Sequence, residues 1–316
     1  MWASIFYLGK GKDLKCPTNK SKRMAVATLA NEHAVEDLKL LLFTLELWNP
    51  VPPAVYIYTD SKTAGKIEAI GYKGQKFIQK DALNAYAGLN RSQMELMKGK
   101  TFSTVFADFC SEKTRLMAWA LAEEQLAGRS GAYFCDADIC HLGPLPRVND
   151  TIRLALSPHM IRDRDSALYG FYNAGYLYMR DIETTTKWLE LCATSRFFEQ
   201  GCLEDLCAWS ITKWPSGFMA FPKQVNYGWW RLWQGDLTAD VLQAEWRIGR
   251  KEGFCGITVA GESLQSIHTH WNDQKDPSVY RFNQWILSQL RKLSSVKKTK
   301  ILISFLEHQH RFLNVA

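Results

Sequence analysis

The chain has 316 residues, of which 47% are hydrophobic and 22% are charged, and its formal net charge is +7. This composition is ordinary for a folded globular protein and argues against disorder, and the length is enough for one large or two smaller α/β domains. The mild positive charge favours anionic partners such as nucleotides, phosphorylated glycans or a lipid headgroup surface. Because the charge is diffuse and no known motif accompanies it, we expect no nucleic-acid partner.

Basic residues gather near both ends of the chain, in residues 10–23 and 291–300. Each stretch is either a solvated end segment or a contact with a membrane surface. No secretory signal peptide precedes the eight cysteines, and no window holds about 18 uninterrupted apolar residues. We therefore expect a cytoplasmic protein with reduced cysteines, for which peripheral membrane association stays open.

The first third of the chain alternates strand and helix patterns. Apolar runs at residues 24–30, 54–60 and 76–79 predict strands, and the patterns at 35–47 and 62–70 predict helices between them. This β-α-β-α-β order is typical of a parallel sheet. Ligands bind at the strand ends of such sheets, so Thr28, Leu29, Ala30 and Asp60 are candidates for holding a nucleotide, with ordinary loop residues as the alternative.

The rest of the chain contains further regular elements and no internal repeat. Residues 81–104 read as a loop with one short helix, and 108–128 as a helix with Ser111 as N-cap and Gly128 as C-cap. Further strands are predicted at 132–135, 153–158 and 171–180, further helices at 182–193, 201–211, 279–293 and 301–312, and a loop at 228–236.

The segment "GAYFCDADICHLGP", residues 131–144, places Asp136 and Asp138 directly after an apolar strand. Side chains alternate along a strand, so both carboxylates are expected on one face. Two like charges this close repel each other unless solvent screens them or a cation lies between them. Carboxylate oxygens suit Mg²⁺ or Mn²⁺. A solvated turn is the alternative, because such triplets often arise by chance.

Six segments in this order resemble the GT-A glycosyltransferases, the nucleotide-diphospho-sugar transferases related to glycogenin. They are "MAVATLANEHAVEDLKLLLFTL", "SEKTRLMAWAL", "YFCDADIC", "FYNAGYLYMR", "FFEQGCLEDL" and "IHTHW". The resemblance implies a Rossmann-like, mainly parallel sheet flanked by helices. It implies transfer of a sugar from a UDP- or GDP-sugar donor to a hydroxyl of a glycan, protein or lipid acceptor, with Mn²⁺ or Mg²⁺ as cofactor.

The same resemblance assigns roles to individual residues. Asp136 and Asp138 match the metal motif, completed by His268 or His270, of which we favour His268. Imidazole suits Mn²⁺ better than Mg²⁺, and the HxH spacing lets both rings face one side of an extended segment. The residues placed at the donor are Lys113, Arg115, Asp136, Ala137, Asn173, Ala174, Gly175 and Gln200. The alternatives are a solvated helix face for Lys113 and Arg115, a backbone-capping residue for Asn173, and an ordinary core or surface role for each histidine.

The carboxylates of "FFEQGCLEDL" are candidates for the base that deprotonates the acceptor. Glu199 with Gln200 aligns with the Asp-Gln pair of the family, although Glu replaces Asp. Glu204 and Asp205 instead resemble the pair of inverting members, and we favour Asp205 as base over a solvated carboxylate at a helix start. Retention and inversion both remain open. Trp229, Trp230, Trp233 and Trp271 either offer faces for sugar rings or belong to the core.

Two other functions compete with this interpretation. A haloacid-dehalogenase-type phosphatase also carries Asp-x-Asp after a strand, but its motif normally opens the chain and continues differently from Ile139 and Cys140. A degenerate fold could instead serve as a non-catalytic glycan-binding subunit. For the favoured function we divide the chain into an N-terminal segment (1–23), a catalytic domain (24–275) and a C-terminal helical appendage (276–316). Residues 24–145 of the catalytic domain would bind the nucleotide, and 146–275 would build the acceptor side.

Overall fold

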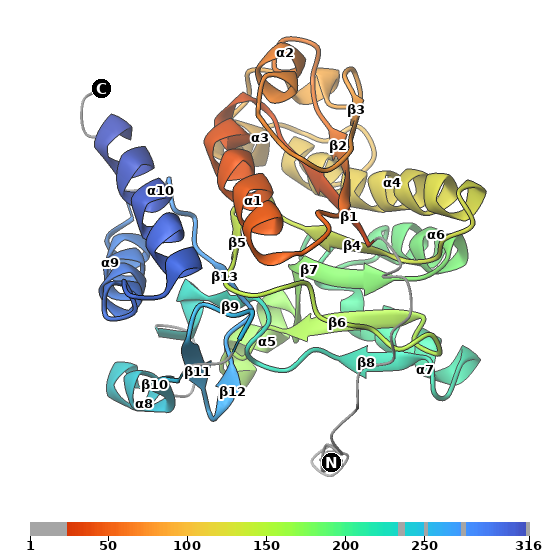
Figure 1. Ribbon diagram of the computed structural model, residues 1–316. Helices are drawn as coiled ribbons and strands as arrows, with labels where there is room; N and C mark the ends of the chain where they lie inside the picture. The colour runs from red at the N-terminus through yellow and green to blue at the C-terminus, as the bar shows by residue number, and fades with distance from the viewer. Residues whose placement is uncertain (1–23, 233–237, 250–251, 273–275, 314–316) are drawn as a thin grey trace.

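The computed structural model describes residues 24–232, 238–249, 252–272 and 276–313. Its central strands are β1 (Ala25–Leu29), β2 (Ala54–Tyr58), β3 (Lys76–Gln79), β4 (Ala132–Cys135), β6 (Leu154–Pro158), β7 (Tyr172–Met179) and β8 (Phe218–Ala220). They form a seven-stranded sheet in the order β3-β2-β1-β4-β7-β6-β8 (Figure 1). Of these strands only β7 runs against its neighbours, β4 and β6, and the other pairs are parallel. The expected α/β class with a mainly parallel sheet is confirmed.

Helices cover both faces of this sheet because the strand side chains alternate and are buried on both sides. Ala27 and Phe134 belong to the face that packs against α3, α4, α6 and α7, whereas Val26 and Tyr133 face α1 and α2. The helix bounds are α1 (Val35–Trp48), α2 (Ala64–Glu68), α3 (Arg91–Leu96), α4 (Val105–Leu126), α5 (Asp163–Tyr169), α6 (Ile182–Cys192) and α7 (Leu203–Lys213), with 3₁₀ turns η1 (Glu32–Ala34) and η2 (Asn84–Tyr86).

The C-terminal third, together with β5, adds two small sheets and further helices, of which α10 packs against α1 (Figure 1). The elements are β5 (Ile139–His141), β9 (Tyr227–Gly228), η3 (Trp229–Leu232), α8 (Ala239–Glu245), β10 (Trp246–Ile248), β11 (Ile257–Val259), β12 (Glu262–Ser263), β13 (Ser266–His268), α9 (Pro277–Arg291) and α10 (Lys297–Leu313). One small sheet has the order β5-β13-β9 and the other β10-β11-β12. Phe305 of α10 stacks on Phe43 of α1, with ring centroids 3.9 Å apart. The expected C-terminal helices are therefore present, while the division at residue 276 stays a prediction.

The start of α4 differs from the sequence prediction. The helix begins at Val105, and the side chain of Thr104 accepts the N-cap hydrogen bond from the Ala107 amide. The predicted cap, Ser111, lies inside the helix, where its hydroxyl donates to the Asp108 carbonyl. Its position as a cap was therefore wrong, because a serine inside a helix satisfies its hydroxyl on the preceding turn. Gly128 does follow the helix end with φ +69°, as expected of a terminating glycine.

Several other expectations concern segments at the margins of the fold. The 228–236 segment contains β9 and η3 up to Leu232, whereas Trp233 and the basic residues 10–23 lie outside the described residues. Seven cysteines are buried free thiols, as expected of packing residues. No helix within the described ranges is long and apolar enough to cross a bilayer.

The buried histidine His141 generates a prediction about acid stability. Its side chain is 0% exposed, neither ring nitrogen finds a hydrogen-bond partner among the described residues, and burial lowers its pKa from 6.5 to about 3. Between pH 6.5 and about 3, the His141 ring therefore binds a proton in the unfolded chain but stays neutral in the folded protein. The free energy of unfolding should fall as pH drops below 6.5, by up to about 1.4 kcal/mol per pH unit from this group.

Urea unfolding at a series of pH values should show a shallower acid decline for His141→Phe than for the wild type. The exposed His33 provides the control, because His33→Asn should leave the decline unchanged. An identical slope in wild type and His141→Phe would contradict this prediction.

Candidate metal centre

The two aspartates of the Asp-x-Asp motif lie on a turn and not on a strand. Strand β4 ends at Cys135, the Ile139 amide donates to the Asp136 carbonyl, and β5 then begins at Ile139. The strand alternation expected of these two residues is therefore absent, because both follow the end of β4 and the chain turns between them. As a result Asp136 and Asp138 have different partners.

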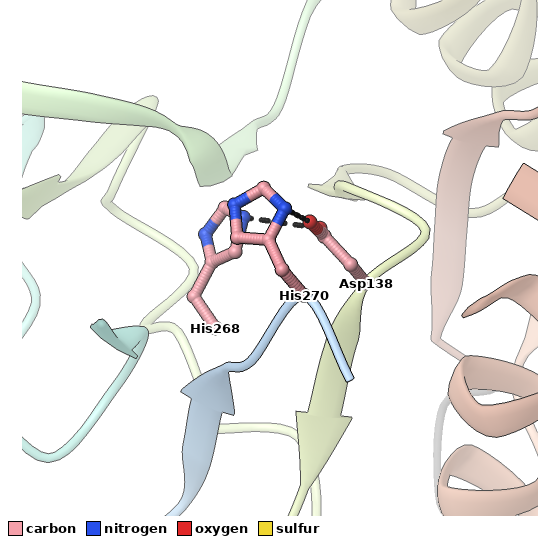
Figure 2. A group of neighbouring side chains, drawn as sticks. All are labelled: Asp138, His268 and His270. Carbon is pink, nitrogen blue, oxygen red and sulfur yellow. Dashed lines mark ion pairs between the residues drawn. The ribbon is translucent and has the colours of Figure 1, made fainter. Parts of the chain in front are cut away.

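The Asp138 carboxylate contacts two imidazole rings, which stack on each other at one side of it (Figure 2). Its Oδ1 lies 3.0 Å from His268 Nε2, and its Oδ2 lies 2.9 Å from His270 Nδ1. Strand β13 brings His268 opposite Ile139 of β5, and the Thr269 amide and hydroxyl both donate to the Asp138 carbonyl. His270 follows with a left-handed φ of +42°, which turns its ring back toward the same carboxylate. Both candidate histidines therefore reach the site.

The Asp138, His268 and His270 side chains could hold a metal ion. One ligand atom from each lies within 4.8 Å of the others. Neighbouring ligands of an ion that binds at about 2.1 Å are about 3.0 Å apart, which agrees with the two aspartate–histidine distances. Two nitrogens and a carboxylate oxygen suit Mn²⁺ and other transition metals better than Mg²⁺. The donor set therefore fits one of the two ions expected from the sequence.

The charges of this group are strongly coupled. Partial burial lowers the pKa of His270, but attraction to Asp138, with further contributions from Asp37 and Asp136, raises it overall to about 9. Burial alone would raise the pKa of Asp138, but the two histidines hold it well below its usual range. In the metal-free protein the His270 ring therefore carries a proton at neutral pH, and a metal ion would displace it.

Asp136 pairs with a buried lysine beside this group. Lys113 Nζ lies 3.0 Å from Asp136 Oδ1 and 2.7 Å from Glu199 Oε1. Burial opposes the charge on Lys113, but the two carboxylates raise its pKa above the usual value. The structure thus brings together three predicted residues: Lys113 of α4, Asp136 of the turn after β4 and Glu199 of the segment before α7. In this arrangement Asp136 contacts the lysine and is not one of the three grouped metal ligands.

Gly175 on β7 lies against both halves of the site. A Cβ at this position would lie 2.6 Å from His268 Cε1, 2.7 Å from Asp136 Oδ2 and 2.8 Å from Asn173 Oδ1. Only a residue without a side chain lets these groups approach one another here. The glycine of the predicted donor segment is therefore required by the packing of the site.

The predicted amide residues lie next to this glycine. Asn173 Nδ2 donates to Gln200 Oε1 at 3.1 Å, and the Ala174 amide donates to the same oxygen at 3.2 Å. Asn173 also contacts Asn226, whose Oδ1 lies 3.1 Å from His268 Nδ1. The sequence prediction missed Asn226, because a single asparagine outside any motif gives no signal.

A second residue missed by the sequence prediction is Asp37 on α1. Its carboxylate accepts from Asn272 Nδ2 at 2.5 Å, and this hydrogen bond links α1 to the segment that follows His270. Burial and then the charge of Asp138 raise the pKa of Asp37 to about 7. An acidic residue in the first turn of a helix is ordinary, so nothing in the sequence distinguished it.

The predicted nucleotide-binding residues lie where β1 and β2 end. Leu29 pairs with Tyr58, so Thr59 and Asp60 continue beyond the same edge of the sheet as Ala30. Asp60 Oδ1 accepts from the Lys62 and Thr63 amides, whereas its Oδ2 has no hydrogen-bond partner among the described residues. Three threonine hydroxyls at or just after these strand ends are likewise buried without a hydrogen-bond partner among the described residues, those of Thr28, Thr59 and Thr63.

Three predicted residues are not brought to the Asp138 group by the contacts of the described chain. Arg115 is exposed on α4 and pairs with Glu112 at 2.6 Å. Glu204 accepts from the Phe171 amide and pairs with Arg196 at 2.5 Å, and Asp205 is exposed in the first turn of α7. Their roles stay predictions, and of the three proposed bases Glu199 alone is linked to the Asp-x-Asp turn, through Lys113 and Asp136.

The tryptophans divide between core and site. Trp271 is 0% exposed and belongs to the C-terminal hydrophobic cluster. Trp230 is buried, donates to the His159 carbonyl and places its ring 5.0 Å from that of His268. Trp229 is only partly buried, and its ring lies 6.2 Å from that of His270. Trp229 is thus the described tryptophan best placed to meet a ligand at the metal group.

Gly175→Ala should damage the metal group, because its methyl group would collide with His268 and Asp136. We expect a stability loss of about 1–3 kcal/mol from overpacking and a clear loss of Mn²⁺ affinity, measured by urea unfolding and by calorimetric titration. Gly65→Ala is the matched control, because a Cβ on that helical glycine meets nothing within 4 Å. Unchanged Mn²⁺ affinity in Gly175→Ala would contradict the predicted role.

Lys113→Met should leave two adjacent carboxylates without their cation. Removing one partner of a buried ion pair typically costs about 3–5 kcal/mol, so we expect a loss of this order in urea unfolding at neutral pH. The double variant Lys113→Met/Glu199→Gln should recover part of it, because the buried charge is removed. A double variant less stable than Lys113→Met would argue against this explanation.

Comparisons with known proteins do not identify the chain. No protein-family model matches its sequence. No curated protein matches it either. What this protein does has to follow from its own residues and their arrangement.

Proposed function

We propose that this protein is a metal-dependent glycosyltransferase that moves a sugar from a nucleotide-diphosphate sugar to a hydroxyl of a glycan, protein or lipid. The observation that carries the proposal is the position of the metal-capable group. Asp138 follows the end of β4, at the edge of the sheet where the parallel strands β1 and β2 also end. Ligands of open α/β sheets bind at this edge.

The ends of β1 and β2 supply a place for the nucleoside. Four buried polar atoms there have no partner among the described residues, namely Thr28 Oγ1, Thr59 Oγ1, Asp60 Oδ2 and Thr63 Oγ1. Such atoms are costly to bury unless a ligand or water satisfies them. The register of β1 on β4, with Ala27 opposite Phe134, sets Leu29 level with Asp136. A nucleoside at Asp60 would therefore extend its diphosphate toward the Asp-x-Asp turn.

The metal would be held by Asp138, His268 and His270, and we favour Mn²⁺ over Mg²⁺ because two of the three ligands are imidazoles. When bound, it supplies positive charge that stabilises the departing nucleoside diphosphate. Lys113 adds a fixed cation beside Asp136, oriented by two carboxylates. This buried ammonium group would face the phosphates or the sugar of the donor.

The chemical step breaks the bond between the anomeric carbon and the diphosphate oxygen, and the electron pair leaves with the diphosphate. A new bond forms between that carbon and the acceptor oxygen, whose proton passes to a carboxylate. Asp205 is accessible for this role, being exposed at the start of α7, whereas Glu204 and Glu199 are ion-paired. Asn173, Ala174 and Gln200 would orient the sugar hydroxyls, because buried amides discriminate strongly between hydroxyl patterns.

The test is metal-dependent release of UDP or GDP from a panel of nucleotide-sugars, with and without a hydroxyl acceptor. We expect activity with Mn²⁺ that a chelator abolishes. Asp138→Asn should lower this activity by more than about 100-fold. Loss of a partner that only hydrogen-bonds to a ligand already costs up to about 100-fold, and Asp138 would be a ligand itself. Circular dichroism should show an intact fold.

Asp240→Asn serves as the control, because Asp240 is an exposed carboxylate on α8. It should keep wild-type activity. Full activity of Asp138→Asn would sink the metal assignment. Binding of a donor or glycan without any turnover would instead favour a non-catalytic glycan-binding protein.

A further inference from the structure

Four side chains connect the donor segment to the metal group through hydrogen bonds. Gln200 Oε1 accepts from Asn173 Nδ2, and Asn173 Oδ1 accepts from Asn226 Nδ2 at 2.8 Å. Asn226 Oδ1 then contacts His268 Nδ1 at 3.1 Å. All four residues are buried, and Asn226 is 0% exposed. We call this series, Gln200–Asn173–Asn226–His268, the amide chain.

Backbone groups fix the orientation of two amides in this chain, those of Asn173 and Gln200. The Gly175 amide donates to Asn173 at 2.9 Å. A backbone N–H can only donate, so the Asn173 atom that it meets has to be the oxygen. The same argument applies to Gln200, whose oxygen accepts from the Ala174 amide while its nitrogen donates to the Tyr169 carbonyl at 2.7 Å. Neither amide can be turned over without placing two donors or two acceptors against each other.

The orientation of Asn226 follows from that of Asn173. Because Asn173 presents its oxygen, Asn226 has to present its NH₂ group to it, and the oxygen of Asn226 consequently faces His268 Nδ1. An amide oxygen only accepts, so His268 Nδ1 carries the proton. A neutral imidazole has one N–H. When a metal ion is bound, the other nitrogen, Nε2, offers its lone pair to the ion. In the metal-free structure Nε2 lies 3.0 Å from Asp138 Oδ1, at hydrogen-bond distance, and the ion would replace this contact.

We propose that Asn226 is a positioning residue that holds His268 in the Nδ1–H tautomer and so presents Nε2 to the metal ion. The inference rests on the metal site of the proposed function. It assigns no part in the chemical step to Asn226, which acts only through His268. Mutation of a residue that hydrogen-bonds to a metal-binding histidine typically lowers metal affinity about 10–100-fold.

The backbone at Asn226 allows a clean set of variants. Its φ is +56°, a left-handed conformation that glycine, asparagine and aspartate tolerate better than other residues. Asn226→Gly removes the acceptor without straining the backbone. Asn226→Asp keeps an oxygen for His268 Nδ1 but loses the donor to Asn173. Both variants break the amide chain at Asn173, and they differ in whether His268 keeps its acceptor.

The experiment measures binding of Mn²⁺ alone by calorimetric titration, together with unfolding by urea. Asn226→Gly should bind Mn²⁺ about 10–100-fold more weakly than wild type. Asn226→Asp should lose stability but stay within a few-fold of the wild-type affinity. Asn49→Ala is the control, because Asn49 is another buried asparagine that joins two segments, through Leu45 and Leu145. It should lower stability without changing Mn²⁺ affinity.

Nitrogen NMR of histidine-labelled, cadmium-loaded protein gives an independent readout of the tautomer. We expect wild-type His268 to bind the metal through Nε2 and to keep a proton on Nδ1. Binding through Nδ1, or wild-type Mn²⁺ affinity in Asn226→Gly, would overturn the inference, and so would equal losses in the glycine and aspartate variants. A wild-type protein that binds no Mn²⁺ rejects this inference and the metal site together. Asn226-dependent Mn²⁺ binding without sugar transfer would support the inference and reject the proposed function.

Discussion

The arrangement of the site depends on one carboxylate, Asp138, which contacts two imidazole rings stacked beside it. Its two oxygens meet His268 and His270 at 3.0 and 2.9 Å. That geometry requires segments 130 residues apart in the chain to meet, which the antiparallel pairing of β13 with β5 provides. The Thr269 hydroxyl and amide then fix the Asp138 backbone from the other side. A buried carboxylate is unfavourable without such partners, so the pairing of two short strands and the site stabilise each other.

Beside this group lies a second cluster with the opposite balance of charge. Lys113 is a single buried cation between Asp136 and Glu199, whereas Asp138 is a single carboxylate that contacts two imidazole rings. The two clusters meet at Gly175, where any side chain would collide with both. Their proximity would let a diphosphate contact the metal on one side and the ammonium group on the other. The amide chain ends at His268 Nδ1 and so fixes the orientation of that one ring.

Much of the fold could be predicted from the sequence, because its signals are local. The apolar strands β1, β2, β4 and β7 and the helices between them follow from periodicity and from bounding glycines and prolines. The part of the site that could be predicted consists of residues in short motifs, namely Asp138 of Asp-x-Asp and the two histidines of His-x-His, His268 and His270. Lys113 and Glu199 were also in the candidate set, although their contact with each other was not foreseen.

What could not be predicted depends on tertiary contact. Asn226 stands alone in the sequence, and it matters only because the fold brings it to His268, 42 residues away. The strand alternation expected of Asp136 and Asp138 is absent because the chain turns after Cys135. The small strands β9 and β12 have two residues each, too few to carry a periodic pattern.

The measurement that tests the central claim most directly is a thermal-shift panel of UDP- and GDP-sugars with and without Mn²⁺. A ligand that binds only the native state raises the melting temperature. If a nucleotide-sugar and a metal share this site, one donor should raise the melting temperature in the presence of Mn²⁺ and not with a chelator. If no nucleotide-sugar shifts the melting temperature under either condition, the nucleotide-sugar assignment is contradicted.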